Sequence, residues 1–363
     1  MGSIFSRFKD ALLELVETKG TSNLKFPHKK LRGILNNYTR GDFIVVGGRK
    51  TSGKSSFILN NYVISPLVQK IPAKKNNTPF DLKVIYISTR KNIKTTIERM
   101  VVNFHANKNS GTKIGVPTLY GFEGSHAKAS VELSKSIVST TLTTLDGLVD
   151  KGLLTVSCTS KTLNEIEVII RSSMEEYGSY DVDTRTFTYD KKHEDLIPII
   201  AIDDSTGINT DAGERSVRTE NGHQIGSRLR ELAKIYNVIL VLAVPSYTGL
   251  FKRRRGKLKG IEDTHSSTLD EVAPYHIYAD RVVIMHNPME TEDSIMLGYE
   301  TADFINNRTG VNYLRTAFVA ANYMGPSGIY LGLFVYPENG YMVELPAADS
   351  DEDLDAFKTI VNS

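Results

Sequence analysis

From Gly41 onward, short apolar runs alternate with stretches whose apolar residues recur every three or four positions. The runs are apolar almost throughout, as in parallel strands covered on both faces, and the periodic stretches are typical of helices. The expected strands are Asp42–Gly47, Lys83–Ser88, Leu153–Ser157, Leu196–Asp203, Val238–Val244 and Arg281–His286. The expected helices are Lys54–Val68, Asn92–His105, Thr162–Tyr177 and Glu220–Tyr236. The alternation predicts a doubly wound α/β domain with a mostly parallel, twisted sheet.

The pattern changes after about residue 298, where apolar stretches are separated by Asn, Gly and Pro turns. These stretches predict antiparallel strands and hairpins appended to the sheet. They are Tyr299–Asn306, Leu314–Ala321, Gly328–Tyr336 and Tyr341–Leu345. Two polar stretches, 107–130 and 178–194, are interpreted as surface insertions. The tail at 349–355 holds five carboxylates and is expected to be a solvated, disordered end.

The N-terminal stretch Ser3–Val16 has apolar residues on one side of a predicted helix and charges on the other. Residues 19–23 form a polar linker after it. The apolar stripe needs a cover, either on its own domain or on a neighbouring subunit. We therefore expect a linker helix at 1–23, one large domain at 24–346 and an acidic tail at 347–363.

The amino-acid composition excludes several classes of protein. The 363 residues are 40% hydrophobic and 24% charged, which excludes a disordered chain. The net charge of +2 means that any nucleic-acid binding surface must be local. A single cysteine, Cys158, fits a reducing, intracellular and cytoplasmic setting. No apolar run approaches the roughly 20 residues that span a bilayer, so no membrane association is expected.

The most specific motif lies between the first expected strand and helix, where residues 48–55 match G-x-x-x-x-G-K-[ST] without a mismatch. Glycines let such a loop wrap closely, so that backbone N–H groups face a polyphosphate. Lys54 is expected to reach the β- and γ-phosphates, and Ser55 to ligate Mg²⁺. The predicted nucleotide-binding residues are Gly48, Arg49, Lys50, Thr51, Ser52, Gly53, Lys54, Ser55 and Ser56.

A second motif is acidic: Asp203 and Asp204 directly follow the apolar run 196–202. A carboxylate at the end of a parallel strand lies at the carboxyl edge of the sheet, beside a phosphate loop. Asp203 is therefore predicted to be the carboxylate on the Mg²⁺ side, together with Ser55.

The ordered set of segments resembles the C-terminal ATPase domain of DnaB-type replicative DNA helicases, which has a RecA-like P-loop NTPase fold. The likeness covers most of residues 26–318, and only the phosphate loop is specific by itself. The segments that carry the likeness are Leu31–Leu35, Arg40–Val46, Leu163–Ile166, Ser227–Lys234, Ala279–Met285, Asn307–Gly310 and Leu314–Phe318.

The resemblance implies a hexameric ring that closes around single-stranded DNA, with ATP and Mg²⁺ between subunits. Arg308 matches the position of the arginine finger that a neighbouring subunit supplies. The helix at Ser3–Val16 resembles the linker helix that packs on the adjacent subunit. The family's separate N-terminal, primase-contacting domain is missing, which suggests a compact phage- or virus-like member. A primase or a loader is a further implied partner.

A basic stretch between two expected strands places six positive charges within residues 252–259, and Tyr247 and Phe251 adjoin it. By itself such a run is most simply a solvated charged loop. The resemblance favours DNA binding, since this region supplies the family's channel loops and Lys/Arg side chains contact phosphates without sequence preference. The expected DNA-binding residues are Lys252, Arg253, Arg254, Arg255, Lys257 and Lys259.

Three positions depart from the family pattern. Arg90 stands where the catalytic glutamate is expected, Val244 where a glutamine sensor is expected and Asn306 where a lysine finger is expected. Hydrolysis needs a group that orients water, which Arg90 cannot do and Asp204 could. Asp203, Asp204 and Arg308 are thus the predicted catalytic residues. A RecA-type recombinase filament and a hydrolysis-deficient, nucleotide-binding structural ring remain as alternatives.

Overall fold

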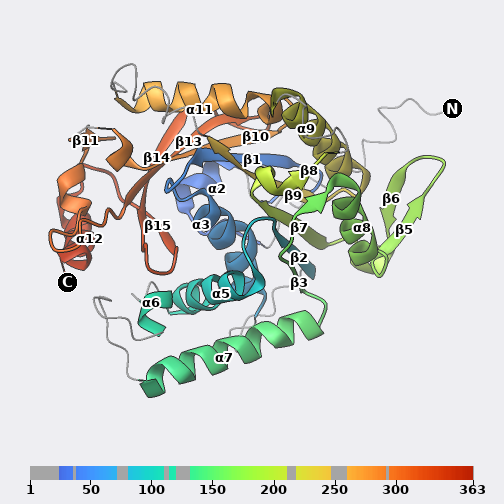
Figure 1. Cartoon of the computed structure of the whole chain (residues 1–363), viewed down its shortest axis with the longest axis horizontal. Helices are drawn as coiled ribbons and strands as arrows, with labels where there is room; N and C mark the ends of the chain where they lie inside the picture. The colour runs from blue at the N-terminus through green and yellow to red at the C-terminus, as the bar shows by residue number, and fades with distance from the viewer. Residues whose placement is uncertain are drawn as a thin grey trace.

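The structure, a computed structural model, describes residues 24–35, 38–71, 81–109, 114–119, 131–210, 218–246, 260–291 and 294–362 (Figure 1). Its centre is a nine-stranded sheet in the order β15-β14-β13-β10-β1-β9-β7-β2-β3. The six strands from β10 to β3 run parallel, whereas β13, β14 and β15 pair antiparallel. The parallel strands are β1 (Phe43–Arg49), β2 (Asp81–Ser88), β3 (Leu154–Ser157), β7 (Leu196–Asp203), β9 (Ile239–Ser246) and β10 (Arg281–His286). The antiparallel strands are β13 (Leu314–Asn322), β14 (Ile329–Val335) and β15 (Met342–Glu344).

Helices cover both faces of the parallel part of the sheet (Figure 1). One face carries α3 (Lys54–Ile58), η1 (Leu59–Ile64), α4 (Ser65–Lys70), α5 (Ile93–Lys108) and α7 (Val131–Asp150). The other carries α8 (Leu163–Met174), α9 (Arg218–Ile235) and α11 (Gly260–His276). Ile44 and Val46 of β1 pack in the hydrophobic core on the face that carries α3, whereas Phe43 and Val45 pack in the core on the face that carries α8. This division explains the uninterrupted apolar runs, because successive side chains of a strand point to opposite, equally covered faces.

The segment at 299–306, expected to be a strand, is mostly not one. It forms the short strand β12 (Tyr299–Glu300), paired with β11 (Ile295–Met296), and continues as the 3₁₀ helix η5 (Thr301–Phe304). Thr301 and Phe304 are buried. Their spacing of three suits a 3₁₀ helix, which has three residues per turn.

The expectation of a disordered acidic tail is wrong. Residues 351–362 form helix α12 (Asp351–Asn362), which packs through Leu354 and Val361 against the antiparallel part of the sheet. The carboxylates cluster in the first turn, where the positive end of the helix dipole favours them. The hydroxyl of Ser350 donates a hydrogen bond to Asp353 (2.7 Å) at this end.

The long helices α7 and α11 and the short helices α2 (Lys29–Leu35) and α6 (Val116–Leu119) are also not among the elements that the sequence predicts. The polar stretch at 178–194 contains the hairpin β5 (Gly178–Asp181) and β6 (Thr186–Tyr189) and the 3₁₀ turn η2 (Lys191–His193). This hairpin packs on the domain, because Phe187 is buried and the Tyr189 hydroxyl donates to the backbone oxygen of Tyr236 (2.7 Å). The remaining short elements are β4 (Lys161–Thr162), η3 (Ser205–Gly207), β8 (Ile208–Asn209) and η4 (Pro288–Glu290).

Some predictions lie outside the described residues, namely the N-terminal helix at 3–16 with its linker, the basic stretch at 252–259 and most of the insertion at 107–130. Within the part of the chain that the structure describes, no helix is both long and apolar enough to cross a bilayer.

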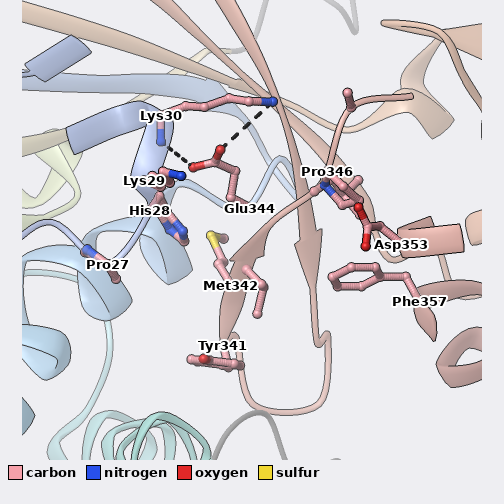
Figure 2. Close-up of a pocket in the computed structure, with 13 residues that line it drawn as sticks. Pro27, His28, Lys29, Lys30, Tyr341, Met342, Glu344, Pro346, Asp353 and Phe357 are labelled. Carbon is pink, nitrogen blue, oxygen red and sulfur yellow. Dashed lines mark hydrogen bonds and ion pairs between the residues drawn. The ribbon is translucent and has the colours of Figure 1, made fainter. Parts of the chain in front are cut away.

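A pocket of about 520 Å³ lies where the start of the described chain meets its end, between α2, β15 and α12 (Figure 2). The backbone N–H of Lys30 donates to Glu344 (2.8 Å), and the Lys30 ammonium lies 4.0 Å from the same carboxylate. His28 lines this pocket but is itself buried. Burial lowers the pKa of His28 to about 4, although a hydrogen bond with Asn61 opposes the shift.

We predict that His28 makes the fold sensitive to mild acid. The unfolded chain binds more protons than the folded chain between pH 6.5 and pH 4, so stability falls as the pH falls through this window. At 1.36 kcal/mol per pKa unit, acidification from pH 7 to pH 5 should lower the free energy of unfolding by about 2 kcal/mol through this group. Urea denaturation at both pH values measures the loss. His28→Leu should abolish most of it, and an equal loss in both proteins would contradict the assignment.

Candidate phosphate-binding site

The loop between β1 and α3 has the backbone that close wrapping requires. Thr51 and Gly53 have positive φ angles of 73° and 93°, and Gly53 directly precedes the first residue of α3. A Cβ atom on Gly48 would lie 2.4 Å from the Ser52 hydroxyl and 2.7 Å from the Met285 carbonyl oxygen, so only glycine fits there. The loop therefore presents the N-terminus of α3 and its N–H groups at the carboxyl edge of the sheet.

Two side chains that are distant in the sequence, Arg315 and Asn287, hold this loop together with its own Lys54. Arg315 of β13 is buried and donates from Nε to the Thr51 carbonyl oxygen (3.3 Å). Asn287, just after β10, donates to the Thr51 hydroxyl (3.5 Å), and Lys54 Nζ donates to the Arg49 carbonyl oxygen (3.3 Å). The sequence gives no signal for the role of Arg315, since an arginine within an apolar strand has no distinctive spacing.

Ser55 and Asp203, which the sequence places 148 positions apart, are in direct contact. The Ser55 hydroxyl donates to Asp203 Oδ1 at 2.6 Å. Asp203 ends β7, is only 2% exposed and lies opposite Ser88, the last residue of β2. The predicted phosphate loop and the acidic residue at the end of β7 thus meet at one edge of the sheet.

The other oxygen of Asp203 is surrounded by donors. Lys91 Nζ lies 2.7 Å from Oδ2, the Tyr86 hydroxyl lies 3.0 Å from it, and an Arg99 nitrogen lies 3.9 Å away. Burial raises the pKa of Asp203, but Lys91, Ser55 and Arg99 outweigh burial, so that the pKa lies below its usual value. The carboxylate is therefore ionised and already neutralised by protein cations.

Arg90 contacts Asp204. The sequence predicts that Asp204 could orient water for hydrolysis and that Arg90 cannot. Asp204 has a φ of 105°, and its Oδ1 accepts hydrogen bonds from the Thr206 backbone N–H (2.9 Å) and hydroxyl (2.8 Å). Its Oδ2 faces an Arg90 nitrogen at 3.5 Å, and the Arg90 side chain is 57% exposed. The arginine therefore lies beside the carboxylate that is predicted to replace the missing glutamate.

Two adjoining pockets of about 470 and 400 Å³ flank Lys54 and Ser55. Their lining includes six cationic side chains against two carboxylates, Asp203 and Asp204. The cations are Lys50, Lys54, Arg90, Lys91, Arg99 and Arg315. Such an excess of positive charge around a helix N-terminus suits a bound polyanion.

Ser55 and Asp203 are the side chains that the sequence predicts as ligands of Mg²⁺. Ser55 and Asp203 supply one hydroxyl and one carboxylate, but both carboxylate oxygens are engaged and an ammonium lies 2.7 Å from one of them. Among the described residues, no group of three or more His, Cys, Asp and Glu side chains could hold a metal ion. These donors therefore do not fit Mg²⁺ while Lys91 lies where it does.

Arg308 lies on an exposed turn after η5 and lines neither of the two pockets. Asn306 in the same turn is buried. Its Oδ1 accepts hydrogen bonds from the backbone N–H groups of Arg308 and Thr309 (3.0 Å each) and from the Thr309 hydroxyl (3.1 Å). Its Nδ2 donates to the Val361 carbonyl oxygen of α12 (2.5 Å). The side chain at the expected lysine-finger position therefore shapes the turn that carries Arg308 and joins that turn to α12.

Val244, at the expected sensor position, is a buried core residue in β9. The six basic residues expected to bind DNA lie outside the described residues, between the end of β9 and the start of α11.

Parallel strands with helices on both faces, a glycine-containing loop after β1 and an acidic residue at the end of β7 agree with the predicted RecA-like α/β fold. The chain is similar over 95% of its length to the whole of a solved structure described as an ATPase domain, with 15% identity and a TM-score of 0.61. It is similar over 94% of its length to 67% of a chain in a solved "DnaB-Like Replicative Helicase", with 16% identity and a TM-score of 0.61. The predicted resemblance to DnaB-type ATPase domains is thereby confirmed for the fold. No protein-family model matches the sequence, and no curated protein matches it.

We predict that Asn306 and Arg308 differ sharply in their effect on stability. Asn306→Ala should lower the free energy of unfolding by about 2 kcal/mol, because it leaves buried partners in the turn and in α12 without hydrogen bonds. Arg308→Ala should change it by less than about 0.5 kcal/mol, because the side chain is exposed. Urea denaturation of both variants beside the wild type measures the difference. Equal losses would contradict the structural role of Asn306.

Proposed function

We propose that this chain binds nucleoside triphosphates and acts as an ATP-driven translocase or helicase on single-stranded DNA, in the manner of DnaB-like helicases. The observation that carries the proposal is the complete phosphate loop whose Ser55 contacts the buried strand-end carboxylate Asp203. The cationic cleft around Lys54 supports a polyphosphate ligand. The solved DnaB-like structures share the fold at low identity, and they support the class of activity by analogy alone.

A ring of six subunits is part of this proposal. Arg308 is exposed and lines neither pocket of its own phosphate site, as expected of a group that acts on a neighbour's nucleotide. The turn that carries it is held by the buried Asn306, which fixes the backbone at Arg308. The basic stretch at 252–259 would then contact single-stranded DNA.

Within the site, each group has a proposed task. Loop N–H groups and Lys54 hold the phosphates, Arg308 of a neighbouring subunit neutralises charge that develops on the γ-phosphate, and Asp204 orients the attacking water. The contact between Arg90 and Asp204 favours one alternative, a ring that binds nucleotide and hydrolyses it slowly or not at all.

Lys54→Ala should abolish nucleotide binding, because it removes the ammonium next to the loop and leaves the fold intact. Titration with a fluorescent ATP analogue measures the affinity, and circular dichroism verifies folding. Lys94→Ala is a matched control, since Lys94 is exposed and pairs with Glu98 in the first turns of α5. An unchanged affinity in the Lys54 variant would overturn the assignment of the site.

We expect slow, DNA-stimulated ATP hydrolysis that depends on Asp204. Asp204→Asn should lower turnover by at least about 10²-fold and leave nucleotide binding intact, as expected when a water-orienting group is lost. Arg90→Glu should raise turnover, because it removes the guanidinium and supplies a second carboxylate. A steady-state ATPase assay with and without single-stranded DNA measures both effects. If the wild type shows no turnover with DNA and Arg90→Glu restores none, the static nucleotide-bound ring becomes the better account.

A further inference from the structure

We propose that Lys91 takes the place of a divalent metal ion, so that this cleft binds nucleoside triphosphate in its metal-free form. The inference rests on the proposed nucleotide binding and deepens it. Its starting point is the ion pair between Lys91 and Asp203, in which Nζ lies 2.7 Å from Oδ2. This distance is that of a strong, charge-assisted hydrogen bond.

Both oxygens of the carboxylate already accept hydrogen bonds, and Oδ2 accepts two. Asp203 Oδ1 accepts from the Ser55 hydroxyl, and Oδ2 accepts from the Tyr86 hydroxyl as well as from Lys91. Mg²⁺ requires a nearly octahedral set of oxygen ligands at short distance. An ion bound to Asp203 Oδ2 would have to displace the Lys91 ammonium or lie beside its like charge.

The backbone of Lys91 is fixed on both sides. It follows the end of β2 by three residues, and the next residue, Asn92, caps α5 by accepting a hydrogen bond from the Thr95 backbone N–H (2.8 Å). The side chain is only 31% exposed, and its charge lies over the carboxylate. Lys91 therefore belongs to the built framework of the cleft.

Lys91 also lies where a phosphate group would meet it. Together with Thr51, Lys54 and Ser55, it lines both of the adjoining pockets. In a metal-dependent site, a divalent ion between the strand-end carboxylate and the phosphates would balance their repulsion. Here the ammonium occupies that intermediate place, and Arg99 adds a second cation 3.9 Å from the same carboxylate.

The test is a titration of the full-length protein with a fluorescent ATP analogue, once in excess EDTA and once in excess Mg²⁺. The wild type should bind with affinities that differ by less than about threefold, since the protein supplies the cation. Lys91→Met keeps the length of the side chain and removes its charge. It should bind at least about tenfold more weakly than the wild type in EDTA, and Mg²⁺ should restore most of the loss, because Asp203 is then available to a metal ion. A tenfold change corresponds to 1.4 kcal/mol.

Lys94→Ala is the matched control and should behave as the wild type in both buffers, because Lys94 is 76% exposed and pairs with Glu98. A melting curve of each variant verifies that it is folded. Wild-type binding that collapses in EDTA by more than about tenfold would overturn the inference and leave nucleotide binding standing. Metal-independent binding that survives in Lys91→Met would overturn the role of Lys91. Absence of binding in both buffers would overturn the proposed function and this inference together.

Discussion

The parallel pairing of β2 with β7 is the constraint on which the rest of the site depends. It places Ser88 opposite Asp203, so both strands end at the same level of the sheet. The strand β9 lies between β1 and β7, and Ser55 reaches across this edge to Asp203. Because the core side chains on both faces fix the register, a slip by one residue would turn Asp203 toward the wrong face. The site is therefore a consequence of packing within the sheet.

Much of this arrangement can be read from the sequence, for physical reasons. Burial on both faces imposes the continuous apolar runs, and close approach to phosphate imposes the glycines, so the parallel strands and the loop at 48–55 are predictable. The ion pair between Lys91 and Asp203 is not, because the two residues lie 112 positions apart and meet only through the register of β2 with β7. Helix α12 is not expected from the sequence because the carboxylates at its start resemble a solvated tail, although Leu354, Phe357, Ile360 and Val361 recur at helical spacing and pack in the core.

Asn306 illustrates how a departure from a family pattern can be structural. An amide can accept and donate at once, whereas an ammonium only donates. At this buried position Oδ1 accepts three hydrogen bonds from the turn and Nδ2 donates one to α12. A lysine could not accept any of the three and would bring an uncompensated charge into the core. The side chain at this position therefore holds the turn and α12 together, and as a neutral amide it supplies no positive charge to a phosphate.

The two carboxylates at the end of β7 are each paired with a cation, but the two pairs differ in strength. The Arg90 side chain is 57% exposed and lies 3.5 Å from Asp204, a geometry in which solvent and side-chain entropy leave little net attraction. Lys91 instead donates at 2.7 Å to a carboxylate that is almost fully buried, where separating the pair would leave a charge without a partner. Arg90 can thus leave Asp204 at small cost, and Asp204 can meet a water molecule. Lys91 cannot leave Asp203 as easily. Asp204, the carboxylate proposed to orient water, is therefore adjustable, whereas Asp203 is held by the protein itself.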